Sequence, residues 1–342
     1  MSGEVSGNFR KMDDPKQIDL PLAEEPLQPT PPETPEYSLL TPQPPLPPTF
    51  NDRIHSIIVG SDGVRVPWRL ILYFLLGAAT LFILGSLLHF WHPKGGARIW
   101  MGMVSEAELM ITVVAPGFVM ARIERRPFGD YGLPSRLAFG KHFWLGALWG
   151  LAGLTVLMLI LRGAGVFYFG GIALHGVRVL KFAAFYGLFF LIVGFFEEFM
   201  MRGYTQFTLT QGIGFWPAAA IFSIAFGCIH LGNPGEAWIG ALAAGLIGFF
   251  FCLTLRRTGS LWFAVGFHAS WDWGETYLYS VPNSGTTAPG HLLSSSFHGS
   301  QWLTGGSIGP EGSVFLFVVL AMMWILFDRM YPPAKYPTIT NA

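Results

Sequence analysis

Apolar residues occupy long stretches of this chain, and shorter segments rich in Arg, Gly and Pro separate them. A helix that crosses the hydrocarbon core of a bilayer needs about 20 mainly apolar residues. The pattern therefore predicts an all-α fold, a polytopic membrane helix bundle of about eight transmembrane helices around a polar cavity. The expected segments cover about 68–91, 99–121, 143–161, 179 to beyond 201, 216–230, 237–255, 261–277 and 314–327.

Turn residues set the limits of the fourth, fifth and sixth segments. The fourth can continue as one long helix through Phe207, until Gly212, Gly214 and Pro217 break it and start the fifth. The sequence Asn-Pro-Gly at 233–235 predicts a turn before the sixth.

The two ends of the chain differ in amino-acid composition from the apolar middle. Twelve of the 25 prolines lie within residues 1–50, mixed with acidic residues. This segment has no basic start followed by an apolar core, so the sequence does not predict a signal peptide. We expect a disordered, Pro-rich cytoplasmic tail over 1–60, a transmembrane domain over 61–335 and a short tail over 336–342. The proline run at 42–48 could dock an SH3-like partner, although we favour a spacer.

Composition supports the membrane interpretation and narrows the function. The chain is 51% hydrophobic and 12% charged, whereas about 25% of an average soluble domain is charged. The formal net charge is zero, so no basic field suggests a nucleic-acid partner. The only cysteines, Cys228 and Cys252, exclude a disulfide scaffold and a four-cysteine metal site.

The basic residues predict how the chain lies in a cell membrane. With both termini in the cytoplasm, the basic loops lie inside, and the loop 278–312, which has no Lys or Arg, lies outside. The inside residues are Arg122, Arg125, Arg126, Arg256, Arg257, Arg329 and Lys335.

Two adjacent glutamates, Glu197 and Glu198, interrupt the fourth apolar segment. A charge at the centre of a membrane helix costs roughly 2.5–3.5 kcal/mol, so both need partners. Arg202 lies four residues after Glu198 and shares its helical face, which predicts an ion pair. Glu197 points about 100° away and is left to face the interior of the bundle.

Two further i, i+4 pairs lie on separate segments. Phe226-x-x-x-His230 ends the fifth segment, and His268-x-x-x-Asp272 lies within the seventh. Asp272 can accept a hydrogen bond from His268 and fix its orientation. Glu106 and Glu108, near the outer end of the second segment, have either a structural role or a minor role in the site.

A glutamate with two histidines can activate water in two ways. Glu197 can act as general base toward a water that His230 also holds, with His268 and Asp272 on the side of a developing oxyanion. Alternatively, Glu197, His230 and His268 can bind Zn²⁺ and leave a fourth position for water. The soluble metalloprotease sequence His-Glu-x-x-His is absent, and spacing alone leaves both routes open.

At these residues the sequence resembles the CPBP (CAAX protease, or Abi) family of intramembrane endopeptidases, which includes the type II CAAX prenyl endopeptidases. The Glu-Glu-x-x-x-Arg, Phe-x-x-x-His and His-x-x-x-Asn/Asp patterns occur in order within about 180–275. The resemblance implies peptide-bond hydrolysis by water that Glu197 and His230 activate. It places His268 and Asp272 on the oxyanion side and makes Glu198 and Arg202 supporting partners. Asp272 stands where the CAAX branch usually has Asn.

We therefore predict an intramembrane protease that acts on a peptide or membrane-protein substrate in the lipid bilayer. A metal-free mechanism is preferred over a zinc site. The alternatives are a transporter or channel with a buried charged pathway and a non-catalytic membrane scaffold. A transporter often has internal repeats, and none is evident here.

Overall fold

The computed structural model describes residues 49–61, 63–90, 98–233, 235–331 and 335–336. The chain divides after Thr49 into two compact units, and the second, Phe50–Ala342, is described below. The proline run, most of the expected 1–60 tail and nearly all of the 336–342 tail lie outside the described residues. Residues 50–60, which we expected within the disordered tail, instead form a helix and a short strand.

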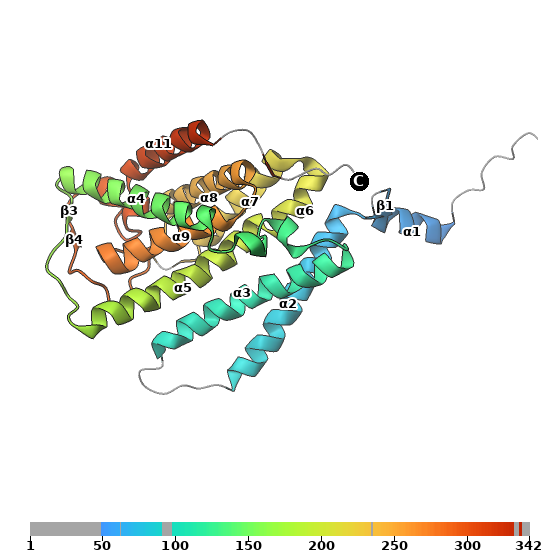
Figure 1. Cartoon of the computed structure of the whole chain (residues 1–342), viewed down its shortest axis with the longest axis horizontal. Helices are drawn as coiled ribbons and strands as arrows, with labels where there is room; N and C mark the ends of the chain where they lie inside the picture. The colour runs from blue at the N-terminus through green and yellow to red at the C-terminus, as the bar shows by residue number, and fades with distance from the viewer. Residues whose placement is uncertain (1–48, 62, 91–97, 234, 332–334, 337–342) are drawn as a thin grey trace, which may run out of the picture. The chain divides into compact units, whose positions relative to one another are not determined.

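The described part of the second unit is a helical bundle with two very short antiparallel strand pairs (Figure 1). The helices are α1 (Phe50–Ile58), α2 (Val66–His89), α3 (Arg98–Ile123), α4 (Lys141–Gly163), α5 (Val177–Arg202), α6 (Tyr204–Ile213), α7 (Phe215–His230), α8 (Trp238–Thr258), α9 (Trp262–Trp273), α10 (Gln301–Thr304) and α11 (Val314–Met330). A π-helix, η4 (Gly274–Tyr279), continues α9, and 3-10 turns occur at η2 (Phe128–Tyr131), η3 (Ser135–Leu137) and η5 (Pro310–Gly312). The strands β1 (Val59–Gly60) and β2 (Gly63–Val64) pair, as do β3 (Phe167–Tyr168) and β4 (Ser296–Phe297).

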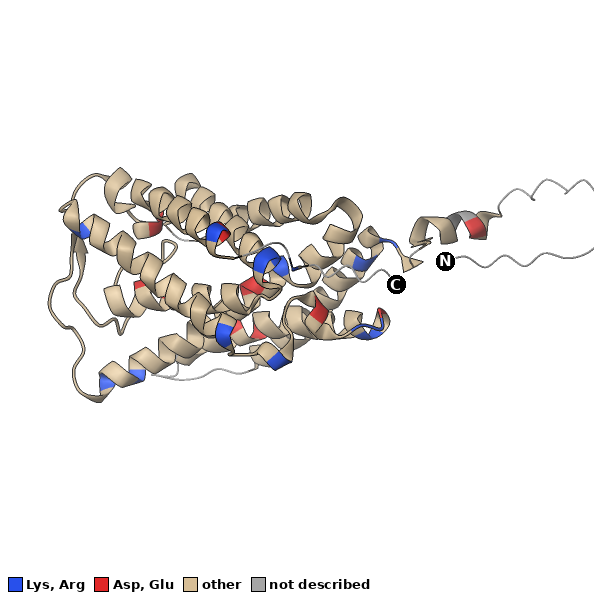
Figure 2. Cartoon of the chain, turned by 45° about the horizontal axis from the view of Figure 1, so that its top comes forward, with Lys and Arg blue, Asp and Glu red and all other residues tan. Residues whose placement is uncertain are grey.

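The all-α membrane class predicted from the sequence is confirmed, but the count of eight spans is not. Among the described residues, five helical stretches are long and apolar enough to cross a membrane. These stretches are Val66–His89, Trp100–Ile123, Lys141–Gly163, Val177–Ile213 and Trp238–Thr258. The other three expected segments fall on the shorter helices α7, α9 and α11. Long parts of the helices carry no charged residue (Figure 2).

The fourth expected segment is not one continuous helix. It is interrupted at Gly203, between α5 and α6, where the backbone leaves the helical conformation. A Cβ atom at this position would clash with the carbonyl oxygen and the ring of Phe199, so the break uses the absence of a side chain. The expected break before the fifth segment is confirmed, since α6 ends at Ile213 and α7 begins at Phe215.

Small residues bring α4 and α9 into close contact. A Cβ atom on Gly146 would clash with the carbonyl oxygen of Phe263, and one on Gly150 would clash with that of Phe267. Glycines four residues apart let membrane helices approach until their backbones touch. Because α9 carries His268 and Asp272, this contact fixes where both side chains lie.

Helix α5 connects two parts of the bundle (Figure 1). On one side it packs against α3, which pairs with α2, and on the other it packs against α9. Gly194 makes the second contact close, because a Cβ there would lie 3.2 Å from the Cβ of His268. The two glutamates of α5 therefore face the histidine of α9.

Candidate active site

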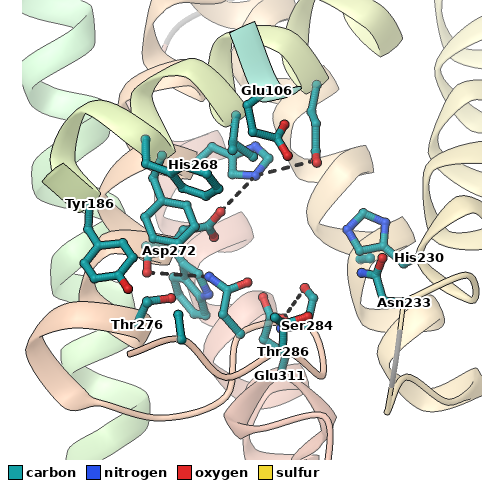
Figure 3. A pocket seen from close by; sticks show the side chains of 18 of the residues that line it. Glu106, Tyr186, His230, Asn233, His268, Asp272, Thr276, Ser284, Thr286 and Glu311 are labelled. Atoms are coloured by element: carbon teal, nitrogen blue, oxygen red, sulfur yellow. Dashed lines mark hydrogen bonds and ion pairs between the residues drawn. The ribbon is translucent and has the colours of Figure 1, made fainter. Parts of the chain in front are cut away.

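A cavity of about 370 Å³ lies where α3, α5, α7 and α9 meet the loop that follows α9 (Figure 3). Its walls are mainly aromatic and aliphatic, with six titratable carboxyl and imidazole groups among them. These groups belong to Glu106, Glu197, His230, His268, Asp272 and Glu311. The structure thus brings together the four residues to which the sequence assigned catalytic roles and adds two carboxyl groups.

The predicted ion pair between Glu198 and Arg202 is present, and neither residue lines the cavity. Nη1 of Arg202 donates to Oε1 of Glu198 over 2.9 Å, and neither side chain has any exposed surface. The guanidinium also lies 4.6 Å from the centre of the Phe226 ring, a cation–π contact. Glu198 Oε2 and the Nε and Nη2 atoms of Arg202 have no hydrogen-bond partner among the described residues.

His268 is surrounded by three carboxyl groups. Its Nδ1 lies 3.0 Å from Oε1 of Glu198, while its Nε2 lies 3.4 Å from Oδ2 of Asp272 and 3.7 Å from Oε2 of Glu197. The expected contact with Asp272 is therefore present. The contact with Glu198 was not expected from the sequence, and it makes Glu198 a partner of both Arg202 and His268.

His230 lies on the other side of the cavity from His268 and Asp272 (Figure 3). Its Nδ1 is 2.8 Å from the backbone carbonyl oxygen of Phe226, and that oxygen can only accept a hydrogen bond. Nδ1 must therefore carry the proton in this contact, so a neutral His230 ring presents Nε2 as an acceptor. The i, i+4 spacing of Phe226 and His230 thus fixes a tautomer as well as a helical face.

The two acidic residues of α3 have different surroundings. Glu106 lines the cavity. Glu108 faces α2, because a Cβ on Gly85 would lie 3.3 Å from its Oε1. Of the two roles that the sequence left open, the placement of Glu106 fits a contribution to the site and that of Glu108 fits a structural one.

Sequence reasoning missed the polar residues that the turn after α7 and the segment after Asp272 supply. These cavity-lining residues are Asn233, Thr276, Asn283, Ser284, Thr286 and Glu311. They carry no helical spacing signal, because most belong to loops and turns. The absence of Lys and Arg from the loop 278–312 led to the prediction that this loop lies on the outer side of the membrane, and it gave no indication of the cavity.

The donor set does not fit the zinc ion considered from the sequence. A three-ligand site needs Glu197, His230 and His268 to direct lone pairs at one point. Instead, both ring nitrogens of His268 face carboxyl oxygens within α5 and α9. Among the described residues, no group of three or more His, Cys, Asp or Glu side chains is arranged to hold a metal ion.

Comparison with known proteins identifies a related family. The family model for type II CAAX prenyl endopeptidase Rce1-like matches residues 179–274, from the start of α5 to the end of α9. The match relates the chain to the CPBP (CAAX protease) family and includes Glu197, Glu198, His230, His268 and Asp272. No curated protein matches the chain.

Proposed function

We propose that this relative of the type II CAAX prenyl endopeptidases is an intramembrane endopeptidase that hydrolyses a peptide bond of a membrane-associated or peptide substrate. The family relation supports CAAX-type intramembrane proteolysis at the level of the family. The observation that carries the proposal is that Glu197, His230, His268 and Asp272, from three different helices, line one cavity among apolar helices.

In the proposed reaction, Glu197 and His230 hold the attacking water. The water donates one hydrogen bond to the carboxylate of Glu197 and the other to Nε2 of His230, whose Nδ1 is engaged by Phe226. Glu197 takes a proton as the water oxygen attacks the carbonyl carbon of the substrate. The same carboxyl group then returns the proton to the leaving nitrogen as the carbon–nitrogen bond breaks.

His268 and Asp272 act on the oxyanion side of the same reaction. Negative charge develops on the carbonyl oxygen during attack and needs a hydrogen-bond donor in a cavity with little water. Anchoring of Nδ1 on Glu198 directs Nε2 of His268 toward the cavity, where Asp272 also faces it. Glu198 and Arg202 support the reaction by holding this ring.

We favour the metal-free route because of the arrangement of the donors. Nδ1 of His268 is engaged by Glu198, and its Nε2 faces the carboxyl oxygens of Asp272 and Glu197. On this proposal a strong chelator leaves cleavage unchanged, and added Zn²⁺ does not increase it. Purified enzyme that contains stoichiometric zinc, loses activity on chelation and regains it with the ion would contradict the metal-free route.

A proteolysis assay in detergent tests the proposed function. A peptide library is incubated with the wild type and with Glu197→Ala, and the products are identified by mass spectrometry. We expect cleavage at defined peptide bonds by the wild type and none by the variant. Cleavage that survives Glu197→Ala would remove Glu197 as the base, and ion flux in proteoliposomes without cleavage would favour the transporter alternative.

We also propose that both termini lie in the cytoplasm and that the protein resides in the cell membrane. The basic loops support this orientation through the positive-inside rule. Cysteines introduced at Ser135 and Ser295 can be probed with an impermeant reagent in intact cells. Labelling of Ser295→Cys alone is expected, and labelling of Ser135→Cys alone would reverse the orientation.

A further inference from the structure

The wall of the cavity that lies beyond α9 is built by residues outside the segment that the family model matches. Asn283, Ser284, Thr286 and Glu311 belong to this wall (Figure 3). The figure places Glu311 and Ser284 across the cavity from Glu106 and His268. Neither the water activation nor the oxyanion contacts described above use them.

Ser284 holds the Glu311 carboxyl group in place. Oε2 of Glu311 accepts one hydrogen bond from the backbone N–H of Ser284 at 3.0 Å and another from its hydroxyl group at 2.7 Å. Oε1 accepts no hydrogen bond from the described residues. The carboxyl group is therefore oriented through one oxygen and keeps the other available.

A tight turn sets the position of Ser284. Asn283 and Thr286 exchange backbone hydrogen bonds of 2.9 and 2.8 Å around Ser284 and Gly285. Ser284 has a positive φ of 41°, a conformation that non-glycine residues adopt rarely and that often occurs at functional sites. The backbone N–H of Gly285 is bonded to the carbonyl oxygen of Ile308, which ties the turn to the segment before Glu311.

Acidic side chains line the cavity on several sides. Four carboxyl groups line it, from Glu106, Glu197, Asp272 and Glu311, and no Lys or Arg is present among its described lining residues. The guanidinium of Arg202 does not line the cavity and is paired with Glu198. A ligand with a positive charge would therefore find complementary groups, whereas an acidic ligand would be repelled.

We propose that Glu311, oriented by Ser284, is a specificity-determining residue that binds a cationic nitrogen of the substrate peptide. This inference rests on the proposed endopeptidase function and names the substrate class. The cationic nitrogen belongs to a Lys or Arg side chain near the cleaved bond or to the free amino terminus of the peptide. Glu311 touches the substrate but takes no part in breaking the bond.

Binding and cleavage of matched peptides test the proposal. The first set of peptides is N-acetylated, and each peptide carries Lys, norleucine or Glu at one position. This position is varied among the residues that flank the cleaved bond. One further peptide carries norleucine and has a free amino terminus. Cleavage is measured with the wild type. Affinity is measured by fluorescence anisotropy with Glu197→Gln, which should hold the peptide uncleaved.

We expect one position, or the free amino terminus, at which the cation improves kcat/KM about tenfold over the uncharged peptide, mainly through KM. Glu311→Gln should abolish this preference for the cation, and Glu311→Asp should keep part of it. Glu311→Lys should instead favour the peptide that carries Glu. Glu108→Gln is the matched control, because Glu108 faces α2 and does not line the cavity. This control should keep the full preference.

The outcomes separate the two proposals. Glu197-dependent cleavage with a preference that Glu311→Gln leaves unchanged would overturn the role of Glu311 and leave the endopeptidase intact. Cation-selective binding that depends on Glu311, without any cleavage, would support the cation subsite and overturn the endopeptidase. Neither cleavage nor Glu311-dependent binding would overturn both. If Glu311→Lys does not fold, Glu311→Gln and Glu311→Asp still decide the result.

Discussion

Two buried charged clusters of this molecule differ in how completely their polar atoms are paired. The first surrounds Glu124, just after α3, where Arg69 donates to both carboxyl oxygens over 2.8 Å and Tyr204 and Tyr131 donate at 2.6 and 3.3 Å. Among the described residues of this cluster, Nε of Arg126 is the one buried polar atom without a hydrogen bond, and it lies 3.1 Å from Glu124 in an ion pair. The second surrounds His268 and leaves Oε2 of Glu197, Oε2 of Glu198 and two nitrogens of Arg202 without hydrogen-bond partners.

The difference separates a structural cluster from a candidate reactive one. Pairing of every charge stabilises a fold, because an unpaired buried polar group costs about 1–3 kcal/mol. The Glu124 cluster joins α2, α6 and the turn after α3, and Glu124 does not line the cavity. Of the residues with unpaired atoms in the second cluster, Glu197 lines the cavity, whereas Glu198 and Arg202 are fully buried outside its lining. The carboxyl group of Glu197 is therefore the unpaired group of this cluster that is placed to contact water and substrate.

The largest expected effect is the loss of the buried ion pair. Glu198→Gln or Arg202→Met leaves the partner charged within apolar surroundings, which costs on the order of 3–5 kcal/mol. Both variants should lower the yield of folded protein as well as activity. Glu197→Gln should leave the yield nearly intact, as measured by size-exclusion chromatography in detergent. Similar yield losses for all three variants would remove the division of roles between the adjacent glutamates.

The Glu124 cluster provides the converse test. Glu124→Gln removes the charge that Arg69 and Arg126 share, so the free energy of unfolding should fall by about 1–3 kcal/mol. Chemical denaturation in mixed micelles would measure this loss. Cleavage per folded molecule should stay unchanged, since Glu124 does not line the cavity. A specific loss of turnover in the folded fraction would contradict the structural assignment.

A third prediction concerns the packing that positions His268. Gly150→Ala would push a methyl group into the carbonyl oxygen of Phe267, and such overpacking typically costs about 1–3 kcal/mol. We expect a lower melting temperature and lower activity, because α9 must move. Gly163→Ala is the matched control on the same helix, since no atom lies within 4 Å of the added methyl group. Equal effects of the two substitutions would argue against backbone contact between α4 and α9.

The smallest expected effect is a pH dependence at Glu311. Burial raises the pKa of this carboxyl group, and the nearby carboxyl groups of Asp272 and Glu236 raise it further, whereas the hydrogen bond from Ser284 and the charge of His230 act in the opposite direction. The carboxyl group of buried Glu275 also interacts electrostatically with that of Glu311. A carboxyl group whose folded pKa is raised contributes stability below its unfolded pKa and loses it as the pH rises through the folded value.

Because ionisation of Glu311 destabilises the wild type as the pH rises, Glu311→Gln should differ from it in the pH dependence of its melting temperature. The two proteins should have similar melting temperatures below about pH 3, where the carboxyl group is neutral in both states because an ordinary Glu titrates at about 4.3. Above that pH, the variant should become progressively more stable than the wild type. Melting curves in detergent at several pH values would measure the difference. A difference that stays constant, or that shrinks as the pH rises, would contradict the raised pKa.

The sequence was informative wherever the geometry is local. Residues four apart on a helix share a face, so the contacts of Glu198 with Arg202 and of His268 with Asp272 could be predicted from spacing. Apolar length and the Gly and Pro breaks similarly predicted the helical class and the start of α7.

Contacts between distant segments could not be predicted in this way. The bond between Glu198 and His268 depends on how closely α5 approaches α9 at Gly194, which spacing along either helix does not determine. Glu311 reaches the cavity through a turn and irregular loops that have no periodic pattern. The break at Gly203 depends on a contact with Phe199 within an otherwise continuous apolar run.

The most direct test of the central claim compares the two clusters in one cleavage assay. Single-turnover cleavage of a peptide substrate is measured per folded molecule for the wild type, Glu197→Gln and Glu124→Gln. We predict that Glu197→Gln loses about 10²–10⁴-fold in rate, the usual contribution of a general base, and that Glu124→Gln cleaves at the wild-type rate. A Glu197→Gln protein that cleaves as fast as the wild type would contradict the assignment of Glu197 as the group that activates water.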